Sequence, residues 1–175
     1  MLDIFMVIWT TTPWTIPSNV AVCINDSFNY VLAESSQGNL IVAEDLIDDC
    51  SQRWGLDLNV IGSTQGKNLT DISLHHPLYQ RESRVLAGEH VTTENGTGCV
   101  HTSPAHGLDD YFICIKNKLE SIKALDNRGL FKEEFGPLAG LSTKKGDPVV
   151  IELLQDAAAL ISTKEYEHSY PHCWR

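Results

Sequence analysis

Residues 9–15 read Trp-Thr-Thr-Thr-Pro-Trp-Thr and follow the apolar run Ile-Phe-Met-Val-Ile at positions 4–8. An apolar, β-branched run of this kind is typical of a buried strand. If strand geometry continues into the threonines, Thr10 and Thr12 share one face and Thr11 takes the other. Three hydroxyl groups at the edge of a core need hydrogen-bond partners. Two interpretations are open: the hydroxyls bind a ligand, or they cap the backbone of their own strand.

The composition is that of an ordinary globular domain with an acidic excess. The chain has 175 residues, 42% hydrophobic and 21% charged, which predicts one domain with a substantial core. Its formal net charge of −10 argues against tight autonomous binding of nucleic acid, because such binding needs Lys and Arg to neutralise phosphates. The apolar runs are too short for a bilayer, and residues 1–9 lack the basic start of a signal peptide. Five cysteines without paired spacing favour reduced thiols and a cytoplasmic location.

Short strands separated by turn residues dominate the rest of the pattern. The expected strands are 20–24, 30–33, 39–42, 58–62, 84–87 and 98–102, and the expected helices are 43–54, 108–119 and 147–160. Many short strands with scattered helices predict an α+β domain. We expect a mostly antiparallel, barrel-like β core with a few flanking helices.

A second informative segment covers residues 96–111, Gly-Thr-Gly-Cys-Val-His-Thr-Ser-Pro-Ala-His-Gly-Leu-Asp-Asp-Tyr. His101 falls at the end of a predicted strand, where an ordinary half-buried histidine and a ligand-facing one are both open. Cys99 shares a strand face with His101, but no third group orients the pair, so a cysteine nucleophile is not favoured.

The helix that follows is amphipathic. Its apolar stripe consists of Leu108, Phe112, Ile115 and Leu119. Asp110 lies about 200° around the helix from Leu108, almost opposite the stripe, so it faces either solvent or a cleft. His106 lies one turn earlier on the same face, which also allows a simple His–Asp surface pair.

Several other chemistries lack their motifs. The chain has no Gly-x-Ser-x-Gly elbow, no Cys-x-x-Cys pair and no phosphate-binding Gly-x-x-x-x-Gly-Lys loop. His168, His172 and Cys173 have a zinc-like interval, but no matching ligand pair stands elsewhere, so we expect no metal.

Three segments together resemble the editing domain of isoleucyl-tRNA synthetases, the connective polypeptide inserted into their catalytic core. The segments are 9–19, 96–111 and 168–175, in order along essentially the whole chain. The resemblance implies that residues 1–175 form a single editing domain cut from a larger synthetase, with 168–175 returning toward the catalytic core. Related valyl and leucyl enzymes carry Thr-Thr-Arg-Pro in the first segment, so Thr12 favours the isoleucyl type. The activation signatures His-Ile-Gly-His and Lys-Met-Ser-Lys-Ser are absent.

The function implied by this resemblance is proofreading, the hydrolysis of mischarged valyl-tRNA(Ile) by an aminoacyl-tRNA ester hydrolase. One methylene changes binding to an apolar pocket by only about 1–3 kcal/mol, an estimate for which isoleucine against valine in this family is the standard example. A second, smaller site is therefore needed to admit valine and exclude isoleucine. An editing domain of the valyl or leucyl type and a non-catalytic insertion that positions tRNA remain the alternatives.

The resemblance also assigns roles to residues. The substrate-binding set is Trp9, Thr10, Thr11, Thr12, Asn19, His101 and Asp110, and the catalytic set is Thr11, Thr12 and Asp110. Asp110 would hold the α-ammonium of the aminoacyl ester, and His101 would form part of the wall that rejects the larger side chain. The threonines would hold the terminal adenosine and orient the attacking water. For Asn19, a turn-stabilising role is the alternative.

The resemblance implies no cofactor in this domain, since ATP and Mg²⁺ belong to the synthetic site of the parent enzyme. The expected partners are the 3′ end of mischarged tRNA(Ile) and the rest of the synthetase chain. We expect a cytoplasmic monomer that binds no membrane.

Overall fold

The computed structural model describes residues 3–164, whose strands form two four-stranded sheets. The first sheet has the order β1 (Ile4–Met6), β4 (Gly38–Ala43), β3 (Asn29–Ser35) and β5 (Asn59–Gln65). The second has the order β6 (Ser73–His75), β7 (Glu82–Ala87), β2 (Ala21–Ile24) and β8 (Cys99–Thr102). Only β1–β4 and β2–β7 pair in parallel within this part of the chain. The α+β class and the mostly antiparallel pairing are confirmed.

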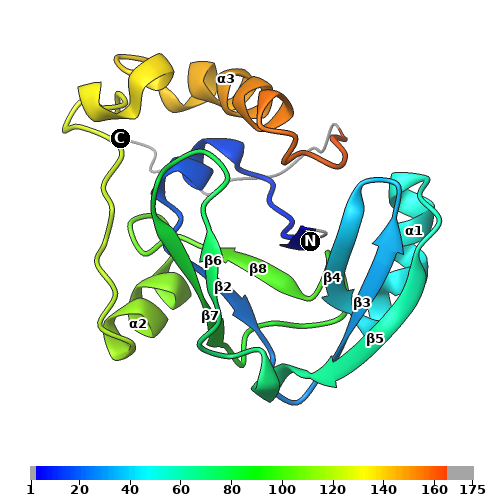
Figure 1. Cartoon of the computed structure of the whole chain (residues 1–175). Coiled ribbons are helices and arrows are strands. Elements are labelled where there is room, and N and C mark those ends of the chain that lie inside the picture. The colour runs from blue at the N-terminus through cyan, green and yellow to red at the C-terminus, as the bar shows by residue number, and fades with distance from the viewer. Residues whose placement is uncertain (1–2, 165–175) are drawn as a thin grey trace.

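Three α-helices and four short 3₁₀ helices complete the described part of the chain. The α-helices are α1 (Ile47–Trp54), α2 (Leu108–Lys116) and α3 (Thr143–Asp156). The 3₁₀ helices are η1 (Pro13–Ser18), η2 (Glu44–Leu46), η3 (Gly66–Asn68) and η4 (Glu133–Leu138). Figure 1 shows α1 beside the first sheet, α2 beside the second, and α3 across one end of both. None of the helices within residues 3–164 has the length and apolarity that a membrane-spanning segment needs.

The main core lies between the two sheets and beneath α1. Its buried members from the strands are Val22, Ile24, Tyr30, Val31, Val42, Ala43, Val85 and Cys99, and Leu46 and Cys50 join them from η2 and α1. Complete burial of an aliphatic side chain of this size contributes about 1.5–3 kcal/mol. The Tyr30 hydroxyl is satisfied inside this core, because it donates to the Gly98 carbonyl over 2.7 Å. The four cysteines within residues 3–164 are free and buried, as expected for reduced thiols.

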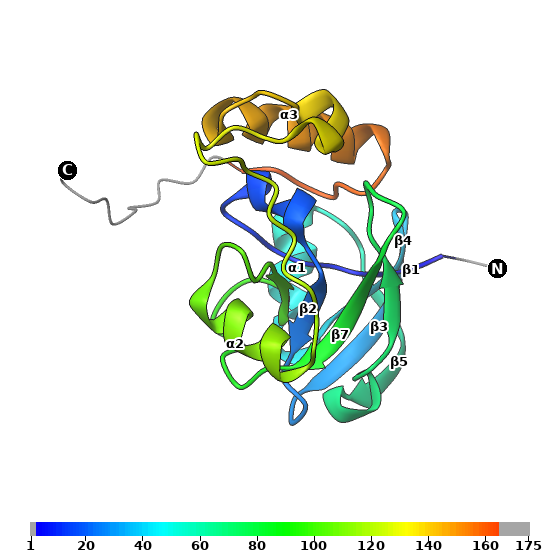
Figure 2. The same ribbon diagram turned by 90° about the vertical axis from the view of Figure 1, so that its left-hand side faces the viewer.

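A separate apolar cluster fixes η1, the segment that follows the threonines. It joins Ile16 of η1 to Phe135 of η4 and Val150 of α3. Asp147 of α3 also accepts the backbone N–H of Trp14 over 2.8 Å. From the other side, the Arg81 guanidinium donates to the Pro17 carbonyl. The helical layer seen at the top of Figure 2 therefore holds the threonine segment in place.

The prediction over residues 4–8 is confirmed as a strand at Ile4–Met6, but its burial is wrong. The Val7 N–H still bonds to the Ile41 carbonyl, whereas Ile4 and Phe5 are 54% and 42% exposed. The reason is the strand order, which places β1 at the edge of its sheet with β4 as its one neighbour. The backbone then leaves strand geometry, and η1 begins at Pro13.

The apolar stripe predicted for the second helix faces solvent instead of the core. Leu108, Phe112 and Ile115 are 72%, 62% and 55% exposed, whereas Cys114 is fully buried. In this rotation the Asp110 carboxylate accepts the Ser103 N–H over 2.8 Å, and Cys114 packs in an apolar cluster with Val20 and Leu86. The face of α2 that packs inward therefore carries Asp110 and Cys114.

The remaining expected elements are present, with their bounds moved by a few residues. The third helix begins at Thr143 and ends at Asp156, earlier than predicted at both ends, and Pro148 lies inside it instead of at its start. Strand β6 and the four 3₁₀ helices were not predicted, since segments this short leave no readable period. The proposed return segment 168–175, with His168, His172 and Cys173, lies outside the described residues.

Candidate functional site

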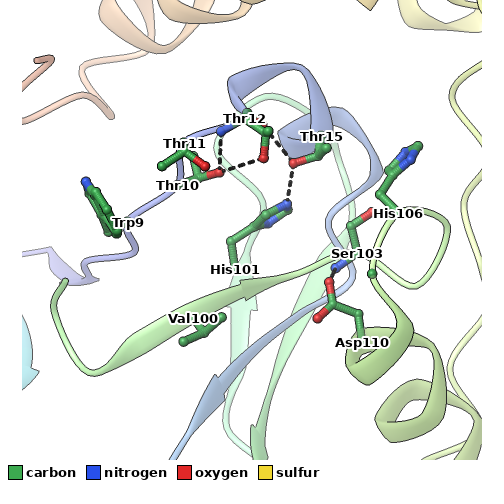
Figure 3. Close-up of a pocket in the computed structure, with 11 residues that line it drawn as sticks. Trp9, Thr10, Thr11, Thr12, Thr15, Val100, His101, Ser103, His106 and Asp110 are labelled. Atoms are coloured by element: carbon green, nitrogen blue, oxygen red, sulfur yellow. Dashed lines mark hydrogen bonds between the residues drawn. The ribbon is translucent and has the colours of Figure 1, made fainter. Parts of the chain in front are cut away.

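A pocket of about 260 Å³ lies where the threonine segment, the end of β8 and the start of α2 meet (Figure 3). Its walls are formed by Trp9, Thr10, Thr11, Thr12, Thr15, Val100, His101, Ser103, His106, Gly107 and Asp110. Every site residue predicted from the sequence except Asn19 lines this pocket. The two informative segments, about 90 residues apart in the chain, therefore form opposite walls of one cavity.

Backbone pairing between the two sheets brings these walls together. Trp9 forms a parallel bridge with Val100 of β8, just after β1 leaves the first sheet. On the other side, the Ala43 N–H donates to the Thr97 carbonyl over 2.8 Å. Gly98 makes this approach fit, because a Cβ there would overlap the Cβ of Ala43, and its φ of +73° favours glycine.

The threonines divide between the two roles that the sequence left open. Thr10 Oγ1 accepts the Thr12 N–H over 3.0 Å and lies 3.2 Å from Thr12 Oγ1, so these residues stabilise their own turn. Thr15 Oγ1 donates to the Thr12 carbonyl over 2.8 Å. The Thr11 hydroxyl bonds to no other residue of the described chain, and it lines the pocket. Thr11 is thus the threonine best placed to bind a ligand.

His101 is buried with both ring nitrogens occupied by protein groups. Nδ1 lies 2.8 Å from Asn19 Nδ2, and Nε2 lies 3.0 Å from Thr15 Oγ1. Burial, reinforced by the nearby His76 and His106, lowers the pKa of His101 from 6.5 to about 3. The ring is therefore neutral, and it offers the pocket mainly its carbon atoms and no free nitrogen for a general base.

Asn19 lies behind His101 and does not line the pocket. Its Nδ2 donates to the Ala21 carbonyl and to His101, both over 2.8 Å, and its Oδ1 accepts from Ser83 Oγ over 2.6 Å. Its side chain is thereby fully used inside the protein. Asn19 acts on the pocket through the imidazole that it holds.

Asp110 presents its carboxylate to the pocket from the first turn of α2. Its Oδ2 accepts the Ser103 N–H, and a Cβ at Gly107 would lie 2.8 Å from this oxygen. Burial raises the pKa of Asp110, while the Ser103 N–H and the charge of His90 oppose the rise. A carboxylate has about four lone-pair sites, so this group keeps acceptor capacity for a cationic ligand.

His106 does not form the surface ion pair with Asp110 that its position allowed. Among residues 3–164 no ion pair joins the two side chains, and His106 Nε2 instead lies 3.2 Å from Ser18 Oγ. Its ring also meets Trp14 edge-on, with centroids 4.6 Å apart. His106 is therefore a wall residue held by η1.

Five pocket residues were not assigned to the site by the sequence analysis: Thr15, Val100, Ser103, His106 and Gly107. The role of Thr15 depends on the 3₁₀ turn of η1, and that of Gly107 on the Asp110 side chain that lies against it. Neither can be read from the sequence. Within residues 3–164 no group of three or more His, Cys, Asp or Glu side chains is arranged to hold a metal ion.

Comparison with known proteins gives relatives by sequence and by structure. No protein-family model matches the chain. The chain is 46% identical over 98% of its length to the isoleucine–tRNA ligase of Nitrosomonas europaea, and 43% identical over 97% to that of Lawsonia intracellularis. It spans only 18% of the length of each relative.

Two solved structures show the same fold. The GlLeuRS-CP1 crystal structure matches with a TM-score of 0.76 at 17% identity, over 93% of this chain and 84% of that one. The editing domain of the P. knowlesi cytosolic leucyl-tRNA synthetase matches with a TM-score of 0.69 at 12% identity, over 89% of this chain and 83% of that one.

Proposed function

Because the chain belongs to the isoleucine–tRNA ligase family, as a segment with the fold of a synthetase editing domain, we propose that it hydrolyses mischarged valyl-tRNA(Ile). In this role it is the second sieve of the ligase. The proposed partners are the 3′ end of the tRNA and the rest of a longer ligase chain, in the cytoplasm. The net charge of −10 implies that other parts of that chain hold the tRNA.

The observation that carries this proposal is the meeting of Asp110, Thr11 and His101 in one small pocket. An aminoacyl ester has a positively charged α-ammonium, and a partly buried carboxylate is a strong partner for it. A hydroxyl without a protein partner can orient the terminal ribose or the attacking water. The His101 ring, with its nitrogens occupied, limits the space for the amino acid side chain.

The proposed reaction is ester hydrolysis by a positioned water molecule. The water oxygen attacks the ester carbonyl, the bond from that carbon to the ribose oxygen breaks, and a proton passes to the departing ribose oxygen. The neighbouring ribose hydroxyl assists the water, since His101 has no free nitrogen to act as its base. Positioning of this kind is enough for large accelerations when the reacting atoms are held in contact.

The test is deacylation of valyl-tRNA(Ile) by the full-length ligase that carries this chain. Removing one partner of a desolvated charge pair costs about 2–5 kcal/mol, so Asp110→Ala should slow hydrolysis by about 30-fold or more. Asp109→Ala is the matched control, because it removes a carboxylate from the neighbouring, exposed position of α2 and should change the rate less than twofold.

Three results would contradict the proposal. A wild-type rate of hydrolysis in Asp110→Ala would show that the Asp110 carboxylate has no role in the site. A wild-type ligase that leaves valyl-tRNA(Ile) intact would favour the non-catalytic insertion that positions tRNA. Hydrolysis of mischarged tRNA(Val) or tRNA(Leu) in its place would favour the valyl or leucyl type.

A further inference from the structure

A continuous series of hydrogen bonds runs from the second sheet to the threonine segment. Ser83 Oγ bonds to Asn19 Oδ1 over 2.6 Å, and Asn19 Nδ2 reaches His101 Nδ1 over 2.8 Å. His101 Nε2 bonds to Thr15 Oγ1 over 3.0 Å, and Thr15 Oγ1 to the Thr12 carbonyl over 2.8 Å. Only the last three of these residues line the pocket, so the series begins outside it.

The chemistry of the end groups fixes the direction of every bond in this series. The Asn19 amide must direct its NH₂ group at the Ala21 carbonyl, which can only accept. Its second N–H is then the donor to His101 Nδ1, so the neutral imidazole carries its proton on Nε2. That N–H donates to Thr15, and the Thr15 hydroxyl is left to donate to the Thr12 carbonyl.

Ser83 is the residue that completes this arrangement at its far end. Ser83 is 4% exposed and Asn19 is 7% exposed, so water does not readily replace the bond between them. Without the Ser83 hydroxyl, the Asn19 amide oxygen would be buried with no hydrogen-bond donor, and a buried acceptor left unsatisfied is strongly disfavoured. Rotating the amide to relieve this would bring its oxygen against the Ala21 carbonyl or remove the donor from His101.

We propose that Ser83 is a positioning residue for the editing pocket, which orients the His101 ring and the threonine segment by anchoring the Asn19 amide. The role in hydrolysis rests on the proposed function, but the control of the imidazole by Ser83 does not. Ser83 itself does not line the pocket.

The first experiment is ¹⁵N NMR of the imidazole nitrogens in the 175-residue chain. Ser83→Ala should change the His101 signals from those of one rigid Nε2–H tautomer to those of a mixture. Ser51→Ala is the matched control. It also removes a hydroxyl that donates a hydrogen bond, from Ser51 in α1 to the Leu56 carbonyl over 2.7 Å, but neither residue lines the pocket. Its His101 signals should equal those of the wild type.

The second experiment is valyl-tRNA(Ile) deacylation by the full-length ligase with the same substitutions. Ser83→Ala should lower kcat about five- to tenfold with little change in KM, a fraction of what a lost buried hydrogen bond can cost. If Ser83→Ala does not fold, Ser83→Cys gives the same test in milder form, because a thiol is a weaker donor of similar size.

Wild-type His101 signals in Ser83→Ala, or an unchanged kcat alongside altered signals, would overturn this inference. Failure of the proposed function has a different signature, since the wild-type ligase would then leave valyl-tRNA(Ile) intact while the NMR signals still responded to Ser83.

Discussion

Two buried histidines should make the fold sensitive to mild acid. Burial lowers the pKa of His76 to about 4 and that of His101 to about 3, against an ordinary value of 6.5. In both rings, the Nδ1 atom that would take the second proton already accepts a hydrogen bond, from the Leu78 N–H in His76 and from Asn19 in His101. Protonation in the folded state would therefore break a buried bond as well as bury a charge.

The sign of the effect follows from proton binding. Between pH 6.5 and about 4 the unfolded chain binds protons on both histidines, while the folded chain does not, so acidification favours unfolding. Each histidine contributes a slope of about 1.4 kcal/mol per pH unit in this range. At pH 4.5 the two together remove about 5 kcal/mol, comparable with the whole stability of an ordinary domain. Asp110 and Asp147 oppose this at lower pH, because burial raises their pKa values.

Urea unfolding followed by circular dichroism at a series of pH values from 7 to 4.5 measures this slope. The wild type should lose at least about 2.7 kcal/mol of unfolding free energy per pH unit below pH 6, because burial also lowers the pKa of His106. His76→Gln should roughly halve the slope, whereas His75→Gln, at the exposed neighbouring position, should leave it unchanged. A wild-type slope below about 1 kcal/mol per pH unit, or an equal slope in His76→Gln, would refute the reasoning.

Four further substitutions test the pocket and its support. His101→Ala should open the wall and let the full-length ligase hydrolyse isoleucyl-tRNA(Ile), so complete protection of this correct product would show that His101 is not the sieve. Thr11→Ala should slow valyl-tRNA(Ile) deacylation about tenfold with Tm almost unchanged, because its hydroxyl has no partner in the described chain. Thr10→Ala should instead lower Tm by a few degrees, because it removes the hydroxyl that accepts the Thr12 N–H. Gly98→Ala should destabilise the chain by about 3 kcal/mol in urea unfolding, since the added methyl meets Ala43 at a positive φ, and an unchanged midpoint would contradict this.

The sequence predicted the candidate site better than it predicted which faces are buried. The threonines stood out because they follow an apolar strand pattern, and Asp110 because it lies opposite the apolar stripe of a predicted helix. The resemblance to synthetase editing domains then assigned both to one site, and the structure places Thr11 and Asp110 on one pocket. The exposure of Ile4 and Phe5 could not be predicted, because it depends on which strand ends the sheet. The rotation of α2 goes with the Asp110 bond to Ser103 and with the packing of Ile113 and Cys114 in an apolar cluster, and the helical period of the sequence shows neither.

Ser83 illustrates the same limit for residues outside the pocket. In the sequence it is one polar residue just before the strand predicted at 84–87. Its importance depends on the register of β2 and β7, which places it beside Asn19 from a distant part of the chain. No local signal in a single sequence carries that register.

His101 and Asp110 are both positioned by strand β8, and this has a consequence for quality control during folding. Both residues reach the pocket through the antiparallel pairing of β8 with β2, which joins segments about 80 residues apart in the chain. A partly folded chain in which β8 has not yet paired therefore lacks both the carboxylate proposed to bind the ammonium and the ring proposed to reject isoleucine. Under the proposed function, such a chain cannot hydrolyse correctly charged tRNA, because the pairing of β8 with β2 brings in the hydrolytic and the discriminating residue together.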